Sequence, residues 1–142
     1  MELSASGLRT DQLEWMMRRI EAYATSCNNL CRSAIDCLGV FAADTIPSRA
    51  TLERHRARLQ SRSGSKSLVC FIANTDPAKK GGSHWVAFVV FASRPTVVEY
   101  FDSFGLALET YSELHSACTR FGYMRSASTI RCANTSSAIR YD

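Results

Sequence analysis

The stretch GGSHWVAFVVFASRPTVVEYFDSFG, residues 81–105, contains two apolar runs separated by a turn. The first run, His84–Phe91, is apolar at both alternating sets of positions, which is typical of a central strand covered on both faces. The second run, Thr96–Phe101, follows after turn-forming residues at 93–95. Because the connection is so short, the two runs predict an antiparallel hairpin.

The length of the hairpin loop determines which residues face each other. A three-residue loop places His84 opposite Asp102, whereas a loop one residue shorter or longer places His84 opposite Ser103. In either case His84 and Asp102 are neighbours, since opposed Cβ atoms are ~5 Å apart. An Asp beside a His at a strand end can fix the ring tautomer for general-base catalysis. A purely structural His–Asp contact is the alternative interpretation.

The flanking segments predict the remaining elements. Helical spacing favours a helix over residues 11–25, a basic helix over 48–60 and a helix over 106–121, and Leu68–Ala73 is a strand candidate. Residues 28–47 give mixed signals, and the apolar piece 38–43 within them leads into a turn. The tail 126–142 has no clear period. Together these elements predict an α+β fold with an antiparallel-rich central sheet and packed helices, in a single domain spanning residues 1–142.

The composition is that of a globular domain. The chain has 142 residues, of which 46% are hydrophobic and 21% charged, so it can bury a core of its own. It has no run of about 20 apolar residues and no secretory signal at its start. We therefore expect an intracellular protein, cytoplasmic or nuclear, that is monomeric and has no membrane contact.

The cysteine pattern favours reduced thiols. Without an export signal, we expect all six cysteines to be free: Cys27, Cys31, Cys37, Cys70, Cys118 and Cys132. The spacing of the first three suggests zinc, but no second ligand pair follows at finger-like spacing, so no metal site is predicted. The role of that cluster stays open. His55 and His115 lie among polar neighbours on predicted helices and are expected to face solvent.

The positive charge is concentrated in one segment. The net charge is +4, and residues 49–66 hold six basic side chains against one acidic side chain, Glu53. A basic helix can contact nucleic acid or an acidic substrate, and a solvated helix face is the other interpretation. The candidate contacts to nucleic acid are Arg54, Arg56, Arg58 and Arg62.

Two blocks of the hairpin resemble a known family. GGSHWVAF (residues 81–88) and YFDSFG (100–105) resemble the histidine and acid blocks of the adenain-like cysteine proteases. This family includes the adenovirus proteinase and relatives in large viruses and Maverick or Polinton transposons, and is distantly similar to SUMO-processing proteases. NTDP (74–77) and GVFAADTIP (39–47) also resemble the viral and transposon versions, so the resemblance covers roughly residues 38–138.

The resemblance implies a domain with the cysteine-protease fold, which processes structural proteins of a virus or mobile element. It makes His84 the general base and Asp102 the group that orients it. Trp85 is expected to pack beside the imidazole, and Gly82 and Ser103 to support the substrate cleft. The partner that the resemblance implies is a peptide or protein substrate, and no cofactor is implied.

The nucleophile block of this family departs from its pattern here. The family has a Gln and then a Cys-Gly pair, and CANTSSAIR (residues 132–140) resembles that block. Cys132 then stands at the Gln position, Ile139 at the nucleophile and Arg140 at the glycine. Isoleucine cannot attack a carbonyl, so we expect an inactive chain.

Three accounts of this departure are open. The chain is a decayed or truncated copy, or its C-terminal part is missing from the sequence, or Cys132 or Cys118 serves as a relocated nucleophile. The rival class is a non-catalytic module that binds peptide or nucleic acid.

Overall fold

In the computed structural model, residues 8–31, 34–63, 67–94, 97–123 and 129–133 are described. The helices are α1 (Thr10–Cys31), η1 (Ala43–Thr45), α2 (Arg49–Ser63), η2 (Leu108–Thr110) and α3 (Ser112–Arg120). The strands are β1 (Ile35–Phe41), β2 (Leu68–Asn74), β3 (Trp85–Phe91), β4 (Val97–Asp102) and β5 (Thr129–Ala133).

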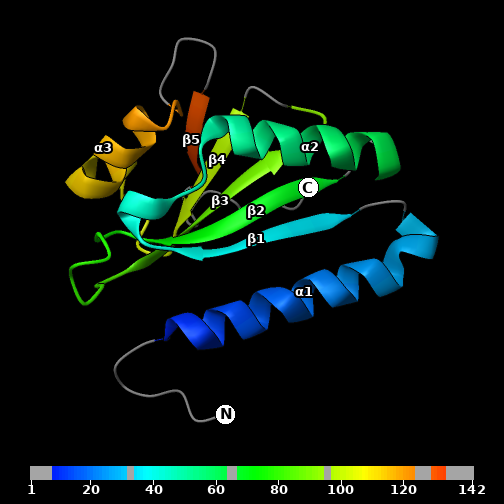
Figure 1. Cartoon of the computed structure of the whole chain (residues 1–142), viewed down its shortest axis with the longest axis horizontal. Helices are drawn as coiled ribbons and strands as arrows, with labels where there is room; N and C mark the ends of the chain where they lie inside the picture. The colour runs from blue at the N-terminus through cyan, green and yellow to red at the C-terminus, as the bar shows by residue number, and fades with distance from the viewer. Residues whose placement is uncertain (1–7, 32–33, 64–66, 95–96, 124–128, 134–142) are drawn as a thin grey trace, which may run out of the picture.

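The strands form one mixed sheet in the order β1-β2-β3-β4-β5. The central strands β2, β3 and β4 pair antiparallel, and the outer pairs β1–β2 and β4–β5 are parallel. α1 runs along β1 on one side of the sheet, while α2 lies on the other side (Figure 1). The predicted α+β class is therefore confirmed, with the antiparallel pairing confined to the centre of the sheet.

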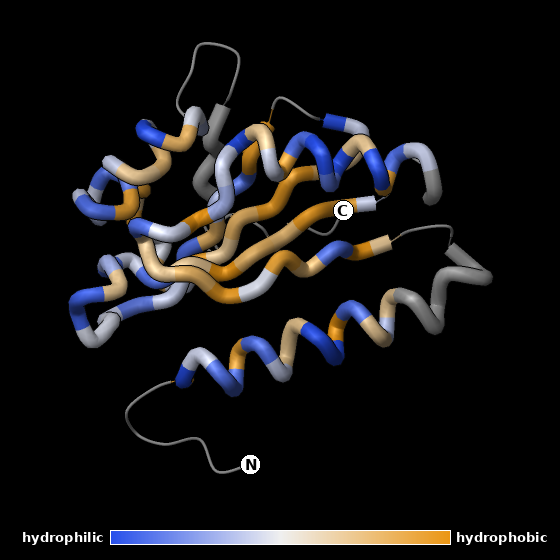
Figure 2. Tube along the Cα trace, viewed as in Figure 1, coloured by the Kyte–Doolittle hydropathy of each residue, from blue (hydrophilic) through white to orange (hydrophobic). Residues whose placement is uncertain are grey.

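The core lies between the sheet and the helices α2 and α3. Alternate positions of β2, β3 and β4 are fully buried, as the two-residue period of a strand requires. Phe71 and Phe88 stack there with ring centroids 4.8 Å apart. Figure 2 shows the hydrophobic colour concentrated in the strands. The opposite face of these strands is only half-buried, so β3 is central but is not equally covered on both sides.

Two strands were not predicted from the sequence. β1 occupies the segment with mixed signals, and its register to β2 shifts between Cys37 and Val40. Gly39, with φ of 127°, lies within that irregularity. β5 occupies part of the tail that showed no clear period. An irregular edge strand and a short parallel strand both lack the alternation that identifies a strand in isolation.

The helices are confirmed with altered limits. α1 extends to Cys31, beyond the predicted end near residue 25. The predicted helix over 106–121 is interrupted at Tyr111, where η2 gives way to α3. This break brings the Tyr111 side chain to the candidate site described below. Among the described residues, no helix is both long and apolar enough to cross a bilayer.

Candidate functional site

The register of the β3–β4 hairpin differs from both expected registers. Asp102 lies opposite Val86, because the connection takes residues 92–96 and is longer than expected. Among its described residues, Arg94 N donates to Phe91 O, and Val97 N donates to Arg94 O.

Despite this shift, the predicted proximity of His84 and Asp102 is confirmed. His84 precedes Val86 by two residues, so it lies diagonal to Asp102 on the same face of the sheet. The alternative pairing with Ser103 would have turned Asp102 to the opposite face, so the expectation that either register makes the two side chains neighbours is wrong for that pairing. His84 Nε2 lies 2.5 Å from Asp102 Oδ1.

This contact defines the tautomer of the histidine. If Nε2 carries the proton that is donated to the carboxylate, Nδ1 of the neutral ring has the available lone pair. The side chain of His84 is 13% exposed and that of Asp102 is fully buried. The pair therefore has the arrangement of a general base and the acid that orients it.

Four donors hold the Asp102 carboxylate. Oδ1 accepts from His84 and from Phe104 N (3.0 Å), and Oδ2 accepts from Leu106 N (3.1 Å) and Tyr111 Oη (2.8 Å). Burial by itself would raise the pKa of Asp102, but these hydrogen bonds outweigh it and lower the pKa below its ordinary value. Asp102 is therefore a fixed buried carboxylate.

Two aromatic residues complete the surroundings of His84. The ring of Phe104 stacks on the imidazole with centroids 4.3 Å apart, and Tyr111 lies at 5.8 Å. Phe104 is 70% exposed, so it covers the imidazole from the solvent side. Burial, together with the bond to Asp102, raises the pKa of Tyr111 to about 12, so its hydroxyl remains a donor at neutral pH.

Phe104, rather than the expected Trp85, stacks on the histidine ring. Successive side chains of a strand point to opposite faces, so Trp85 leaves the sheet on the side away from His84. Phe104 stands in the acid block itself and was recognisable as the aromatic of its turn. Tyr111 had no sequence signal, because its segment was predicted to continue as a helix.

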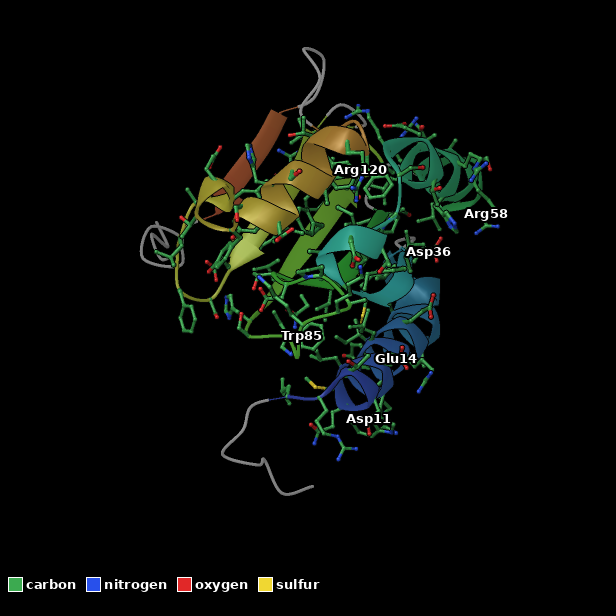
Figure 3. The ribbon with its side chains drawn as sticks, turned by 60° about the vertical axis from the view of Figure 1, so that its left-hand side comes forward. Asp11, Glu14, Asp36, Arg58, Trp85 and Arg120 are labelled. Carbon is green, nitrogen blue, oxygen red and sulfur yellow. The ribbon has the colours of Figure 1, made fainter. Side chains whose placement is uncertain are left out.

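Trp85 lies in a groove at the end of the sheet. Its indole Nε1 donates to the main-chain carbonyl of Leu8 at 2.8 Å. Figure 3 shows Trp85 beside the start of α1, where Asp11 and Glu14 lie. A cavity of about 310 Å³ is lined by residues 8–10 together with Asn74, Gly81, Gly82, Ser83 and Trp85. Residues 8 and 9, before α1, thus lie against this groove, with the main-chain carbonyl of Leu8 bonded to Trp85.

The other resembling blocks meet beside this groove, where a second cavity is lined by residues 40–42 and 76–78 together with Asn74, Gly82 and Trp85. Ala43 N donates to Asp76 O (3.0 Å), and Ala78 N donates to Asp44 Oδ1 (2.9 Å). These bonds join the segment 39–47 to residues 76–78. Ser83 Oγ also donates to Asp76 Oδ2 (2.7 Å), which fixes the chain immediately before His84.

Gly82 is required by the close approach of Asn74. Its φ is 73°, and a Cβ at this position would lie 2.5 Å from Asn74 Nδ2. We expect Gly82→Ala to destabilise the fold by about 1–3 kcal/mol, through backbone strain and displacement of the buried Asn74. Gly81→Ala is the matched control, since nothing lies within 4 Å of its added Cβ. Urea unfolding measures both, and equal stabilities of the two variants would contradict the prediction.

The remaining predicted site residues lie apart from this arrangement or outside the description. Ser103 is exposed in the turn after Asp102. The backbone of Cys132 lies in β5 opposite Tyr100, but its side chain is outside the described residues. Ile139 and Arg140 are also outside them, so the departure of the nucleophile block stays a prediction from sequence.

Two of the candidate arginines of α2, Arg56 and Arg58, have acidic partners within the protein. Arg56 pairs with Glu53 (2.9 Å) and donates to Ala92 O (3.3 Å). Arg58 lies 3.6 Å from Asp36, and the two are close together in Figure 3. Arg54 is exposed and bonds Thr51 of its own helix. The side chain of Arg62 lies outside the described residues.

The expectation that His55 faces solvent is wrong. His55 Nδ1 lies 2.7 Å from Asp36 Oδ2, which links α2 to the edge strand β1. Asp36 was not considered as a partner because β1 was not predicted. His115, in α3, is partly buried.

Three cysteines have described side chains, and all three are free thiols: Cys37, Cys70 and Cys118. Within the described ranges, no group of three or more His, Cys, Asp or Glu side chains is placed to hold a metal ion. Cys27 and Cys31 lie at the end of α1, in a part whose side chains are not described.

No model of a known protein family matches this chain, and no curated protein sequence matches it. The adenain-like resemblance therefore depends on the sequence blocks, and the candidate site depends on its own geometry.

Proposed function

We propose that this chain is an adenain-like, cysteine-peptidase-type domain of viral or mobile-element origin that binds extended peptides without cleaving them. The observation that supports this most is the His84–Asp102 pair, in which a buried carboxylate with four donors orients an imidazole at a strand end. A histidine that acts as a base needs an orienting carboxylate that is itself held in place by hydrogen bonds. The ancestral substrates are structural proteins of the virus or element.

The groove at Trp85 supports the peptide-binding part. An indole N–H is a donor with an apolar body, so it can hold a main-chain carbonyl while its ring packs on the chain. Leu8 O occupies that donor in the structure. A peptide held at Trp85, the first residue of β3, lies one residue along the chain from His84, whose side chain points to the opposite face of the sheet.

Removing residues 1–9 is expected to open the groove. A synthetic peptide of residues 4–11 should then bind the shortened chain, measured by calorimetry, and should bind the full chain much more weakly. Trp85→Phe in the shortened chain keeps the ring and removes the donor, so we expect about 5-fold weaker binding, the effect of one hydrogen bond.

Circular dichroism is the control that checks whether each of these variants is folded. Absence of binding to a folded, shortened chain would overturn the peptide-binding proposal. Equal affinity of the Trp85→Phe variant would show that the indole donor is not used.

Nucleic-acid binding through α2 is the second candidate, but the pairing of Arg56 and Arg58 with acidic partners supports it less well. Binding to nucleic acid would weaken steeply with salt, because it releases counterions. Binding of the neutral peptide to the groove should change little between low and high salt.

A further inference from the structure

Cys37 and Cys70 lie side by side at the edge of the sheet, away from the His84 site. They are Cα partners in the parallel pair β1–β2. Their Sγ atoms are 3.5 Å apart, and both thiols are free and half-buried. Neither residue has a part in the peptide-binding function proposed above.

The backbone geometry is compatible with a covalent bond between them. Partners in neighbouring strands have Cα atoms about 5 Å apart, within the range of about 4.4–6.8 Å found in disulfides. The two sulfurs need to approach by about 1.5 Å to reach a bond length near 2.05 Å. The irregular register beside Cys37, with Gly39 at positive φ, is where β1 can adjust.

A cavity between α1 and β1 gives access to the first of these thiols. It has a volume of about 270 Å³, and Cys37 lines it together with Glu14, Met17, Arg18 and Glu21. This space admits the reactive end of a small disulfide or thiol. Cys118, in contrast, is completely buried in the core.

The two thiols differ in reactivity. The hydrogen bond from Cys70 lowers the pKa of Cys37, although burial and the charges of Glu21 and Asp36 oppose this. The same hydrogen bond and burial raise the pKa of Cys70 above its ordinary value. Cys37 is therefore the thiolate that attacks first, since the thiolate is the nucleophilic form.

We propose that Cys37 and Cys70 form a reversible disulfide that joins β1 to β2 when a low-molecular-weight disulfide such as oxidised glutathione is present. The Cys37 thiolate attacks one sulfur of the reagent, forming a mixed disulfide and releasing one glutathione thiolate. Cys70 then loses its proton and attacks Cys37 Sγ, releasing the second glutathione. Two protein thiols are oxidised, and one disulfide is reduced to two thiols.

The bond would fasten the edge strand that α1 covers. It closes a loop that contains all of α2, so it restricts the unfolded chain. We expect the oxidised protein to have a Tm higher by about 5 °C or more. Reduction with dithiothreitol should return the Tm to its original value.

The test uses the full chain with Cys27, Cys31 and Cys132 replaced by Ser, so that only the three described thiols remain. The folded protein is treated with oxidised glutathione, alkylated, and mapped by mass spectrometry. We expect loss of two titratable thiols, a mass lower by two hydrogens, and one linked peptide pair containing Cys37 and Cys70. The unsubstituted chain should give the same linked pair.

Matched variants separate this proposal from general oxidation. Cys118→Ser should leave the linkage and the Tm change intact, whereas Cys37→Ser or Cys70→Ser should abolish both. The proposal is overturned if the reaction stops at a mixed disulfide on Cys37. It is equally overturned if the unsubstituted chain links Cys37 to Cys27 or Cys31, or if the bond forms only after unfolding.

Discussion

Asp102→Ala is expected to destabilise the protein by about 3–5 kcal/mol, the largest effect of any single substitution at the sheet end. The substitution removes a carboxylate that four donors share, two of them main-chain N–H groups that follow β4. Because Asp102 is 1% exposed, water cannot easily replace the lost acceptor. Chemical unfolding with urea measures this loss.

Two further substitutions calibrate the effect of Asp102→Ala. Asp102→Asn keeps the shape but directs an amide N–H₂ toward donors, so a smaller loss of about 1–3 kcal/mol is expected. Asp44→Ala is the control, since exposed Asp44 accepts a single bond from Ala78 N, and its loss should stay within about 1 kcal/mol. If Asp102→Ala were no more harmful than Asp44→Ala, the carboxylate would not organise the turn.

The lowered pKa of Asp102 predicts the pH dependence of stability. A carboxyl with a lower pKa in the folded than in the unfolded state binds fewer protons when folded, so it stabilises the fold above the unfolded pKa near 4. That contribution is lost as the pH falls from about 4 through the folded pKa. The wild-type chain should therefore lose more stability over this range than Asp102→Asn does, as denaturation at fixed pH values can measure.

The hairpin could be predicted from the sequence because its two strands alternate and are close together. The contact between His84 and Asp102 was predicted correctly even though the register was wrong, since a shift of two residues keeps both side chains on one face. A shift of one residue would have separated them. The predicted contact therefore depended on whether the register shift was an even or an odd number of residues, and the loop sequence alone did not determine this.

The surroundings of the pair could not be predicted in the same way. Tyr111 reaches Asp102 because the chain breaks between η2 and α3, and helical spacing alone does not reveal such a break. The bond between Trp85 and Leu8 joins residues far apart in the sequence. Such contacts follow from tertiary packing, which no local pattern encodes.

The basic helix shows a further limit of sequence patterns. From the sequence, every arginine of the helix was an equal candidate for contact with nucleic acid. In the structure, Arg56 pairs with Glu53 and Arg58 lies near Asp36. Asp36 comes from β1, the strand whose alternation was interrupted. The surface charge of α2 is therefore smaller than the sequence of that helix indicates.

Peptide hydrolysis by this chain is expected to be indistinguishable from the buffer rate, a loss of at least about 10⁶-fold relative to an active enzyme. Among the described residues, the ring of His84 hydrogen-bonds to Asp102 alone, so no thiol is paired with the base. Cys118 is completely buried, and burial raises its pKa to about 12, so it stays protonated at neutral pH. The free thiols of Cys37 and Cys70 form a hydrogen bond with each other.

The measurement is incubation of the purified chain with a peptide library and with a cysteine-directed peptide probe. Ile139→Cys combined with Arg140→Gly restores the family pattern at two positions, and we expect it to gain probe labelling but little turnover. Turnover should stay low because, if the chain follows the proposed adenain-like pattern, Cys132 stands where a glutamine would donate to the oxyanion, an interaction worth about 3 kcal/mol. Cleavage by the unsubstituted chain that disappears with His84→Ala, together with labelling of Cys132, would instead show that Cys132 is the nucleophile and that His84 activates it.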